Sequence, residues 1–174
     1  MKEILTLFAE YNREANRRLY AIAEKHLEAV SKPAGSYFDN VMGLLNHILV
    51  SDLGWLVAYR DGNLDLPILH SAVLEFEHPG WKKNLHDDFG KLREHREAID
   101  DLLVEFVTNT SSSLFEGNIE VTRKGKSKPR IFPFGKLIVH LFNHQTHHRG
   151  AISQVLDEAE VENDYSNILP LLIT

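Results

Sequence analysis

The chain of 174 residues contains no cysteine, so neither disulfide bonds nor thiolate metal ligands can form within it. Any metal ion must therefore be held by histidine, aspartate or glutamate, and any thiol in the chemistry must come from a substrate. Basic residues are not in excess either, since acidic residues outnumber them and the net charge is -6. This charge argues against nucleic acid as the main partner. With 43% hydrophobic residues, we expect residues 1–174 to form a single domain.

Long apolar runs are scarce as well. Met1 leads directly into an amphipathic pattern with no leader-like apolar segment, and we expect no stretch to be long enough to span a bilayer. Internal repeats and low-complexity segments are also missing from the sequence. These absences favour a soluble, cytoplasmic protein without membrane contact.

What the sequence does contain is helical periodicity. Apolar residues recur at spacings of three and four in four segments, covering about residues 2–29, 36–59, 84–109 and 134–157. Ser36 is a suitable N-cap for the second segment. The third segment is preceded by about twenty residues without clear periodicity, which is typical of an overhand crossover or a lid. A short helix near residues 70–76 fits within this connection.

Between residues 110 and 133 the pattern alternates instead, which predicts a small β-hairpin or extended excursion before the last helix. Five basic residues crowd the expected tip of the hairpin: Arg123, Lys124, Lys126, Lys128 and Arg130. A solvated turn is the ordinary interpretation, and a basic flap that attracts an anionic substrate or a partner is the alternative. The apolar end of the chain, residues 168–173, is expected to dock on the helices or to fill a dimer interface.

Four histidines fall within nine residues of the last helical segment: His140, His144, His147 and His148. His144 and His148 occupy the apolar stripe of that helix, four residues apart. Imidazoles at this spacing lie roughly 40° apart around the axis and about 6 Å along it, so both can bind one metal ion. The alternative is a pair of buried, hydrogen-bonded histidines, since a stable metal site needs three or four ligands.

Further candidates lie beside these histidines and on the second helix. His47 adjoins the buried face of that helix and is the natural third ligand, although a surface or capped histidine fits the same pattern. Asp52 replaces an apolar residue in the stripe, where it could orient a ligating imidazole or pair with a basic residue. Arg149 could bind an anionic group or form a structural ion pair. Gly150 is expected to let another helix approach closely.

Three sequence patterns resemble the DinB-like (DinB/YfiT) superfamily of metalloenzymes: Tyr11-Asn12-x-x-Ala15-Asn16, Asn46-His47-Ile48-x-x-x-Asp52-x-x-Trp55 and Asn143-His144-x-x-His147-His148-Arg149-Gly150. The resemblance covers nearly the whole chain. It implies an all-α four-helix bundle with a long crossover connection, often a homodimer, and a divalent metal ion (nickel or zinc) on His47, His144 and His148. The family usually continues Arg-Gly-Gln, whereas Ala151 follows Gly150 in this sequence.

The resemblance also implies a function, because characterised relatives include transferases and isomerases that use low-molecular-weight thiols. Three imidazoles leave a coordination position open, where the ion lowers the pKa of a bound water or thiol. Asp52, as proton acceptor or orienter, and Arg149, as an anion binder, are the candidate catalytic residues. We therefore expect a metal-dependent transferase acting on a thiol, or a hydrolase. The alternatives are a non-catalytic dimeric metal-binding or stress-response protein, and a helical bundle without metal.

Overall fold

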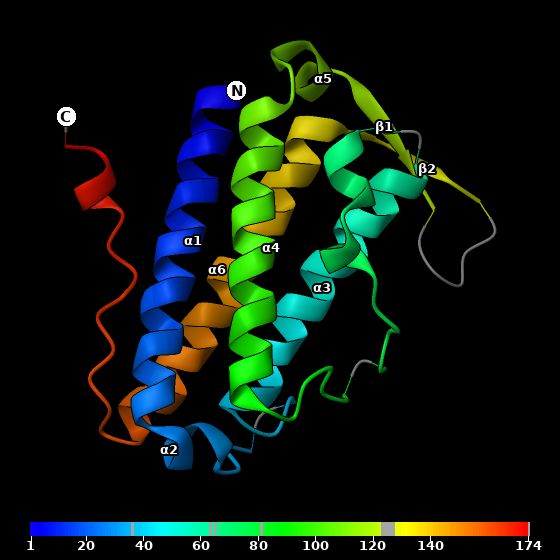
Figure 1. The fold of residues 1–174 in the computed structure, drawn as a ribbon. Helices are drawn as coiled ribbons and strands as arrows, with labels where there is room; N and C mark the ends of the chain where they lie inside the picture. The colour runs from blue at the N-terminus through cyan, green and yellow to red at the C-terminus, as the bar shows by residue number, and fades with distance from the viewer. Residues whose placement is uncertain (36, 63, 65, 81, 123–127, 174) are drawn as a thin grey trace.

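The structure, a computed structural model, describes residues 1–35, 37–62, 64, 66–80, 82–122 and 128–173. Its core is a bundle of four long helices (Figure 1): α1 (Lys2–Lys25), α3 (Val41–Asp61), α4 (Phe89–Asn109) and α6 (Phe134–Glu158). The helices bury apolar stripes against one another, with Leu19, Leu53 and Leu141 fully enclosed. The expected all-α four-helix bundle is confirmed.

The directions of the helices explain the long connection in the middle of the chain. In Figure 1, α1 and α6 run one way along the bundle, and α3 and α4 run the other way. Because α3 and α4 are parallel, the chain must return along the bundle between them, which confirms the predicted crossover. Instead of one short helix, the crossover contains two 3-10 turns, η1 (Pro67–His70) and η2 (Ala72–Leu74), because the extended backbone of Ser71 separates them.

Three helix boundaries differ from the sequence-based expectation. The first helix breaks at His26, whose backbone leaves the helical region (φ -130°, ψ 41°), and the short α2 (Leu27–Ser31) follows. Helix α3 begins at Val41, because the Asn40 side chain accepts a hydrogen bond from the Gly43 N–H and caps the helix. Ser36, the expected cap, lies outside the described residues. Asp88 caps α4 in the same way, which moves its start to Phe89.

The excursion before α6 is a hairpin, as predicted. After the short α5 (Ser112–Glu116), strand β1 (Asn118–Val121) pairs antiparallel with β2 (Arg130–Pro133). The strands lie at the end of the bundle where α3 finishes and α6 begins (Figure 1). Of the basic tip, residues 123–127 fall outside the described chain, while Lys128 and Arg130 are exposed. The function of that tip stays a prediction.

The segment after α6 runs back along α1 (Figure 1). Tyr165 is buried and its hydroxyl donates to the Arg149 carbonyl oxygen at 2.6 Å, while the Tyr11 hydroxyl donates to the Ser166 carbonyl oxygen at 3.0 Å. From Leu169 onward the apolar residues are open to solvent, with Leu169 61% and Ile173 81% exposed. The predicted docking is therefore made around Tyr165 and by Ile168, which packs on the core, and not by the rest of the apolar end.

Helix α3 is long and apolar enough to cross a bilayer by length and composition, with a mean hydropathy of 1.5. The expectation that no stretch reaches that length is therefore wrong for α3. However, 61% of its most apolar window is buried inside the bundle. A core helix of a soluble bundle passes the same test, so this hydropathy is weak evidence for a membrane span.

Candidate metal centre

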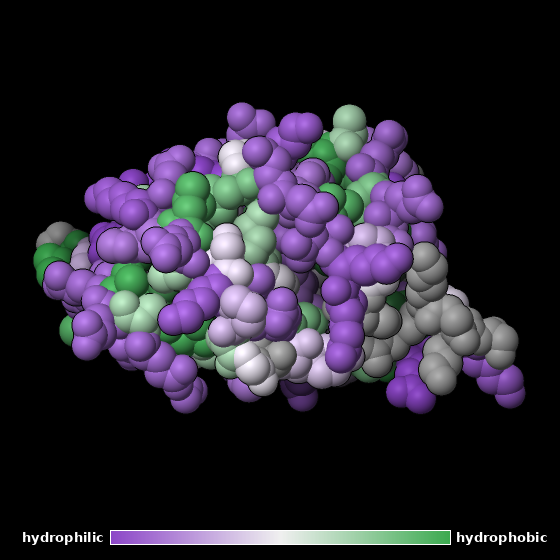
Figure 2. Space-filling model, turned by 90° about the horizontal axis from the view of Figure 1, so that it is seen from below, coloured by the Kyte–Doolittle hydropathy of each residue, from purple (hydrophilic) through white to green (hydrophobic). Residues whose placement is uncertain are grey.

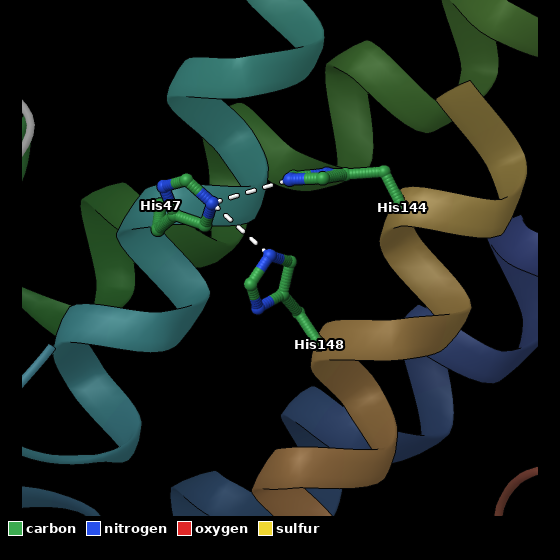
Figure 3. A group of neighbouring side chains, drawn as sticks. All are labelled: His47, His144 and His148. Carbon is green, nitrogen blue, oxygen red and sulfur yellow. Dashed lines mark hydrogen bonds between the residues drawn. The ribbon is translucent and has the colours of Figure 1, made fainter. Parts of the chain in front are cut away.

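Three histidines converge between α3 and α6 (Figure 3). His47 comes from the second turn of α3, and His144 and His148 come from successive turns of α6. The Nε2 atom of His47 lies 3.2 Å from the Nε2 atoms of both His144 and His148. Ligand atoms from all three lie within 4.8 Å of one another. The three histidines that the sequence predicted to converge thus lie together in the fold.

The geometry of this trio suits a metal ion better than a set of hydrogen bonds. With metal–nitrogen bonds of 2.0–2.1 Å, two tetrahedral ligands have nitrogens about 3.3 Å apart. A neutral imidazole nitrogen is either a donor or an acceptor, so His47 Nε2 can make only one linear hydrogen bond although two nitrogens face it. A cation between the lone pairs satisfies all three nitrogens together.

The protonation state of the trio also fits a metal. Burial, followed by the neighbouring His148, lowers the pKa of His47 to about 4. Burial and the surrounding imidazoles lower the pKa of His144 to about 3, and burial also lowers the pKa of His148. All three side chains are therefore neutral near pH 7, which leaves lone pairs free for coordination.

The second ring nitrogen of His144, Nδ1, also needs a hydrogen-bond partner. His144 Nδ1 is buried and has no hydrogen-bond partner among the described residues. When Nε2 of an imidazole binds a metal ion, Nδ1 carries the proton and needs an acceptor, which a buried water can provide. The donor set and its neutrality thus fit a divalent ion.

Phe38, from the loop before α3, covers the trio. Its ring stacks on His47, with centroids 4.1 Å apart, and meets the His148 ring edge-on at 5.8 Å. The close approach of this loop requires Gly43, because a Cβ atom there would collide with the Phe38 carbonyl oxygen. Phe38 falls within the expected second helical segment, residues 36–59, and the sequence contains no signal for this contact.

Two hollows flank Phe38 and reach the trio from different sides. A narrow one is lined by His47 together with Gly80, Lys82, Lys83 and Asn84 of the crossover. A larger one, about 280 Å³, opens beside His148 and is lined partly by Tyr37, Leu44, Ala151 and Val155. This end of the molecule mixes hydrophilic and apolar residues on its surface (Figure 2). Because Ala151 lines the larger hollow, its small side chain leaves space there that a glutamine would fill.

The other histidines have different positions. His140 and His147 are exposed, with ring contacts to His144 and His148 respectively, and neither belongs to the cluster of close ligand atoms. His86 and His95 lie half-buried, with His86 Nε2 2.9 Å from His95 Nδ1. His86 precedes α4, and a contact across a helix start leaves no periodic signal in the sequence.

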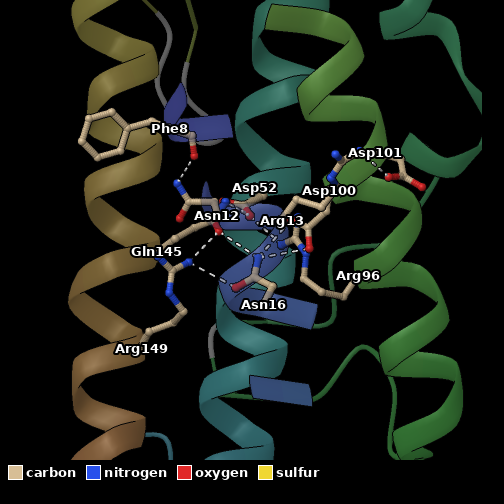
Figure 4. Close-up of polar contacts among 10 residues, drawn as sticks. All are labelled: Phe8, Asn12, Arg13, Asn16, Asp52, Arg96, Asp100, Asp101, Gln145 and Arg149. Atoms are coloured by element: carbon tan, nitrogen blue, oxygen red, sulfur yellow. Dashed lines mark hydrogen bonds and ion pairs between the residues drawn. The ribbon is translucent and has the colours of Figure 1, made fainter. Parts of the chain in front are cut away.

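Asp52 and Arg149 lie in a buried polar cluster (Figure 4), which also contains Asn16, Arg96, Asp100 and Gln145. Asp52 Oδ2 accepts hydrogen bonds from Arg96 at 2.6 Å and from the Gln145 amide at 3.0 Å. A second Arg96 nitrogen lies 2.9 Å from Asp100. Burial raises the pKa of Asp52 to about 6, against the attraction of Arg96. Asp52 is thus paired with an arginine, the alternative that the sequence left open.

Arg149 completes the cluster from α6. Its guanidinium donates to Asn16 Oδ1 and Gln145 Oε1, both at 3.2 Å, and lies over the Tyr11 ring at 5.3 Å. Asn16 in turn donates to Asp100. The hydrogen bonds of Asp52 lie within the cluster, whereas Arg149 also contacts Tyr11 and Thr146, and the catalytic roles expected for both stay predictions. Sequence reasoning missed Arg96, Asp100 and Gln145.

Gly150 does not serve a close helix contact. It is exposed, and a Cβ atom added there would meet no heavy atom within 4 Å among the described residues. The expectation that Gly150 admits a neighbouring helix is therefore wrong. The glycine in α3 that does permit a close approach is Gly43.

The fold and the trio define a helical-bundle protein with three converging histidines that could hold a metal ion. The sequence model of the DinB family matches residues 1–166, so the chain belongs to the DinB family. It is similar to Protein DinB of Bacillus subtilis (strain 168), with 25% identity over 159 residues that cover 86% of this chain and 83% of that protein. No solved structure matches the chain.

Proposed function

We propose that His47, His144 and His148 hold a divalent metal ion, nickel or zinc, in an enzyme that transfers a low-molecular-weight thiol. The observation that carries the proposal is the convergence of three neutral imidazoles. The Nε2 atom of His47 lies 3.2 Å from the Nε2 atoms of His144 and His148, close to the separation of two nitrogens bound to one tetrahedral ion. Because the chain has no cysteine of its own, the thiol comes from a substrate.

An open site supports an enzyme over a structural metal site. Three protein ligands leave at least one position for a substrate, and hollows beside His47 and His148 give access to it. When bound, a divalent ion lowers the pKa of a thiol that enters that position. Phe38 shields one side of the imidazoles from water. Asp52 and Arg149 act as positioning residues, since both bind Gln145, the neighbour of His144.

The alternative function is a non-catalytic, dimeric metal-binding or stress-response protein in the same soluble, cytoplasmic setting. The exposed apolar end of the chain supports a homodimer contact, since such side chains rarely stay in water: Leu169, Leu171, Leu172 and Ile173. Light scattering of the full chain and of a Leu172→Asp variant tests the dimer. A halved mass in the variant supports this interface, and a monomeric wild type contradicts it.

Metal analysis of protein purified without a histidine tag tests the metal site. We expect one ion per chain in the wild type and a loss of affinity of at least about 100-fold in His148→Ala, which removes a ligand. His147→Ala is the matched control, because that neighbouring imidazole is exposed and lies outside the trio. Equal trace metal in all three proteins would eliminate the site.

A turnover screen separates the two functions. Metal-loaded protein is mixed with small thiols and electrophiles, and consumption of the free thiol is followed. An enzyme consumes thiol in a reaction that His148→Ala abolishes and His147→Ala retains. The non-catalytic alternative predicts bound metal in the wild type without turnover of any thiol.

A further inference from the structure

The crossover is pinned to α3 directly beside the trio. Asn46, the buried neighbour of His47, accepts hydrogen bonds on Oδ1 from the backbone N–H groups of Leu85 and His86, both at 2.9 Å. Its Nδ2 donates back to the His86 carbonyl oxygen at 3.0 Å. One amide side chain therefore satisfies three backbone groups of the crossover and fixes this segment one residue from a metal ligand.

A second set of contacts holds the same segment to α4. His95 donates through Nε2 to the Val73 carbonyl oxygen at 2.9 Å, so its Nδ1 is the acceptor that faces His86 Nε2. The backbone just before His86 is thus held between α3 and α4. This part of the crossover carries Lys82 and Lys83, whose placement beside His47 follows from these contacts.

Among the residues that the structure describes, the two lysines have no anionic partner. Neither forms an ion pair with a described residue, and Lys82 Nζ lies 4.2 Å from the centroid of the exposed Tyr37 ring. The carboxylates that follow in the sequence are engaged elsewhere, since Asp87 accepts from Asn84 and Asp88 caps α4. On a chain with a net charge of -6, this is a local cationic site.

The shape of the hollow shows where an anion would lie. Its free space is about 10 Å³, which is about enough for one water molecule. The hollow itself is therefore too small for an anionic group, and its mouth, where the lysines lie, is the place left for one. A divalent ion on the trio is itself positive, and the two lysines add a second centre of positive charge beside it.

We propose that Lys82 and Lys83 bind the carboxylate end of an anionic thiol substrate whose sulfur reaches the trio; this rests on the proposed function. The larger apolar hollow beside His148 is then left for the second reactant of the transfer. Strands β1 and β2 lie at the opposite end of the bundle from α2 (Figure 1).

Calorimetry on the nickel-loaded protein tests this proposal with 3-mercaptopropionate and its neutral amide, 3-mercaptopropionamide. Both probes carry the same thiol on a chain of the same length and differ in charge. We expect the wild type to bind the acid about 10-fold more tightly at low ionic strength, and the difference to shrink at roughly 0.5 M salt because screening acts on exposed charges. The Lys82→Gln/Lys83→Gln double variant should lose most of this preference, and the positive nickel ion should maintain only a smaller one.

Lys136→Gln is the control, because Lys136 is an exposed lysine at the start of α6, and it should keep the wild-type preference. Equal affinities of the wild type for both probes, or a preference that is undiminished in the double variant, would overturn the lysine assignment while leaving the metal and the thiol in place. Absence of nickel binding, or no binding of either thiol, would overturn the proposed function and this inference together.

Discussion

The trio and the buried polar cluster place polar side chains on the same two helices, yet they differ in how those side chains are satisfied. In the cluster, Asp52 and Gln145 bind each other and charged neighbours, with no access to solvent. In the trio, His47 and His148 are half-buried and line hollows. Polar groups that bind one another hold helices together, whereas polar groups left facing an opening form a site for another molecule.

The two regions are neighbours because of helix geometry. His144 and Gln145 are consecutive on α6, so their side chains point about 100° apart around the axis. One therefore faces His47 across the opening, and the other reaches Asp52 in the interior. The cluster sets the spacing of α3 and α6, and the trio uses that spacing. Four predictions test whether the two regions are separable.

The largest expected effect is on stability, from Arg96→Met in the cluster. Without this arginine, Asp52 and Asp100 lose their ion pairs in a buried environment, which should lower the free energy of unfolding by about 3–5 kcal/mol. Urea denaturation measures the change. Arg93→Met, on the same helix, removes exposed ion pairs and should cost about 1 kcal/mol or less. Similar losses in the two variants would refute the assigned importance of the cluster.

Gln145→Leu separates the cluster from the trio. It leaves Asp52, Asn16 and Arg149 short of hydrogen bonds, so we expect a loss of roughly 2–3 kcal/mol in denaturant unfolding. Metal affinity should change less than about tenfold, since the imidazoles remain. The exposed Gln154→Leu is the stability control, with an effect within about 0.5 kcal/mol. Complete loss of metal from folded Gln145→Leu would mean that the two regions act as one.

The regions should respond to pH with opposite signs in metal-free protein. The folded pKa values of His47 and His144, about 4 and about 3, lie below the usual 6.5, so the unfolded chain takes up protons first. Their contribution to stability is complete above pH 6.5 and is lost as the pH falls toward those values. Burial raises the pKa of Asp52 and Asp100, so their contribution is present at low pH and is lost as the pH rises from about 4 through their folded pKa values.

Urea denaturation between pH 7 and pH 5 separates these contributions. His144→Gln should lose less stability on acidification than the wild type, by on the order of 1 kcal/mol, because its imidazole is only partly shielded from solvent. Asp100→Asn should lose more than the wild type, because a carboxyl that gains a proton in the folded state has been removed. Identical pH slopes in all three proteins would contradict the prediction.

The smallest effect is expected at Gly150, next to the cluster on the exposed face of α6. Gly150→Ala should raise the free energy of unfolding by about 0.5–1 kcal/mol, because alanine favours the helix and meets no neighbour. Thermal unfolding measures the gain. Gly43→Ala should have the opposite sign, since its Cβ atom would collide with the Phe38 carbonyl oxygen. A loss of stability in Gly150→Ala would show that this position serves a contact outside the chain.

Sequence reasoning found the trio but missed most of the cluster, for a physical reason. His144 and His148 interrupt an apolar stripe, and such an interruption is visible from spacing alone. Arg96 and Asp100 lie in a segment rich in charged residues, where they look like a solvated helix face. Their burial depends on how α4 rotates against α1 and α3, and the sequence of one helix does not contain that rotation.

The loops were the other source of error. The breaks at His26 and before Val41 depend on local backbone geometry and on the Asn40 cap, and they shift the expected boundaries by several residues. Phe38 and Lys82 reach the trio from two loops far apart in the sequence. No periodic pattern predicts such a meeting, because loop residues have no fixed spacing.

The sequence by itself determined the helical segments, the hairpin, the long crossover and the residue types that can bind a metal ion, because periodicity and side-chain chemistry are local properties. Tertiary packing alone decided that three Nε2 atoms meet, that Arg96 neutralises Asp52 in the interior, and that two lysines lie beside His47. These contacts join residues separated by tens of positions. Their distances are set by helix rotation and loop paths, which depend on the whole core.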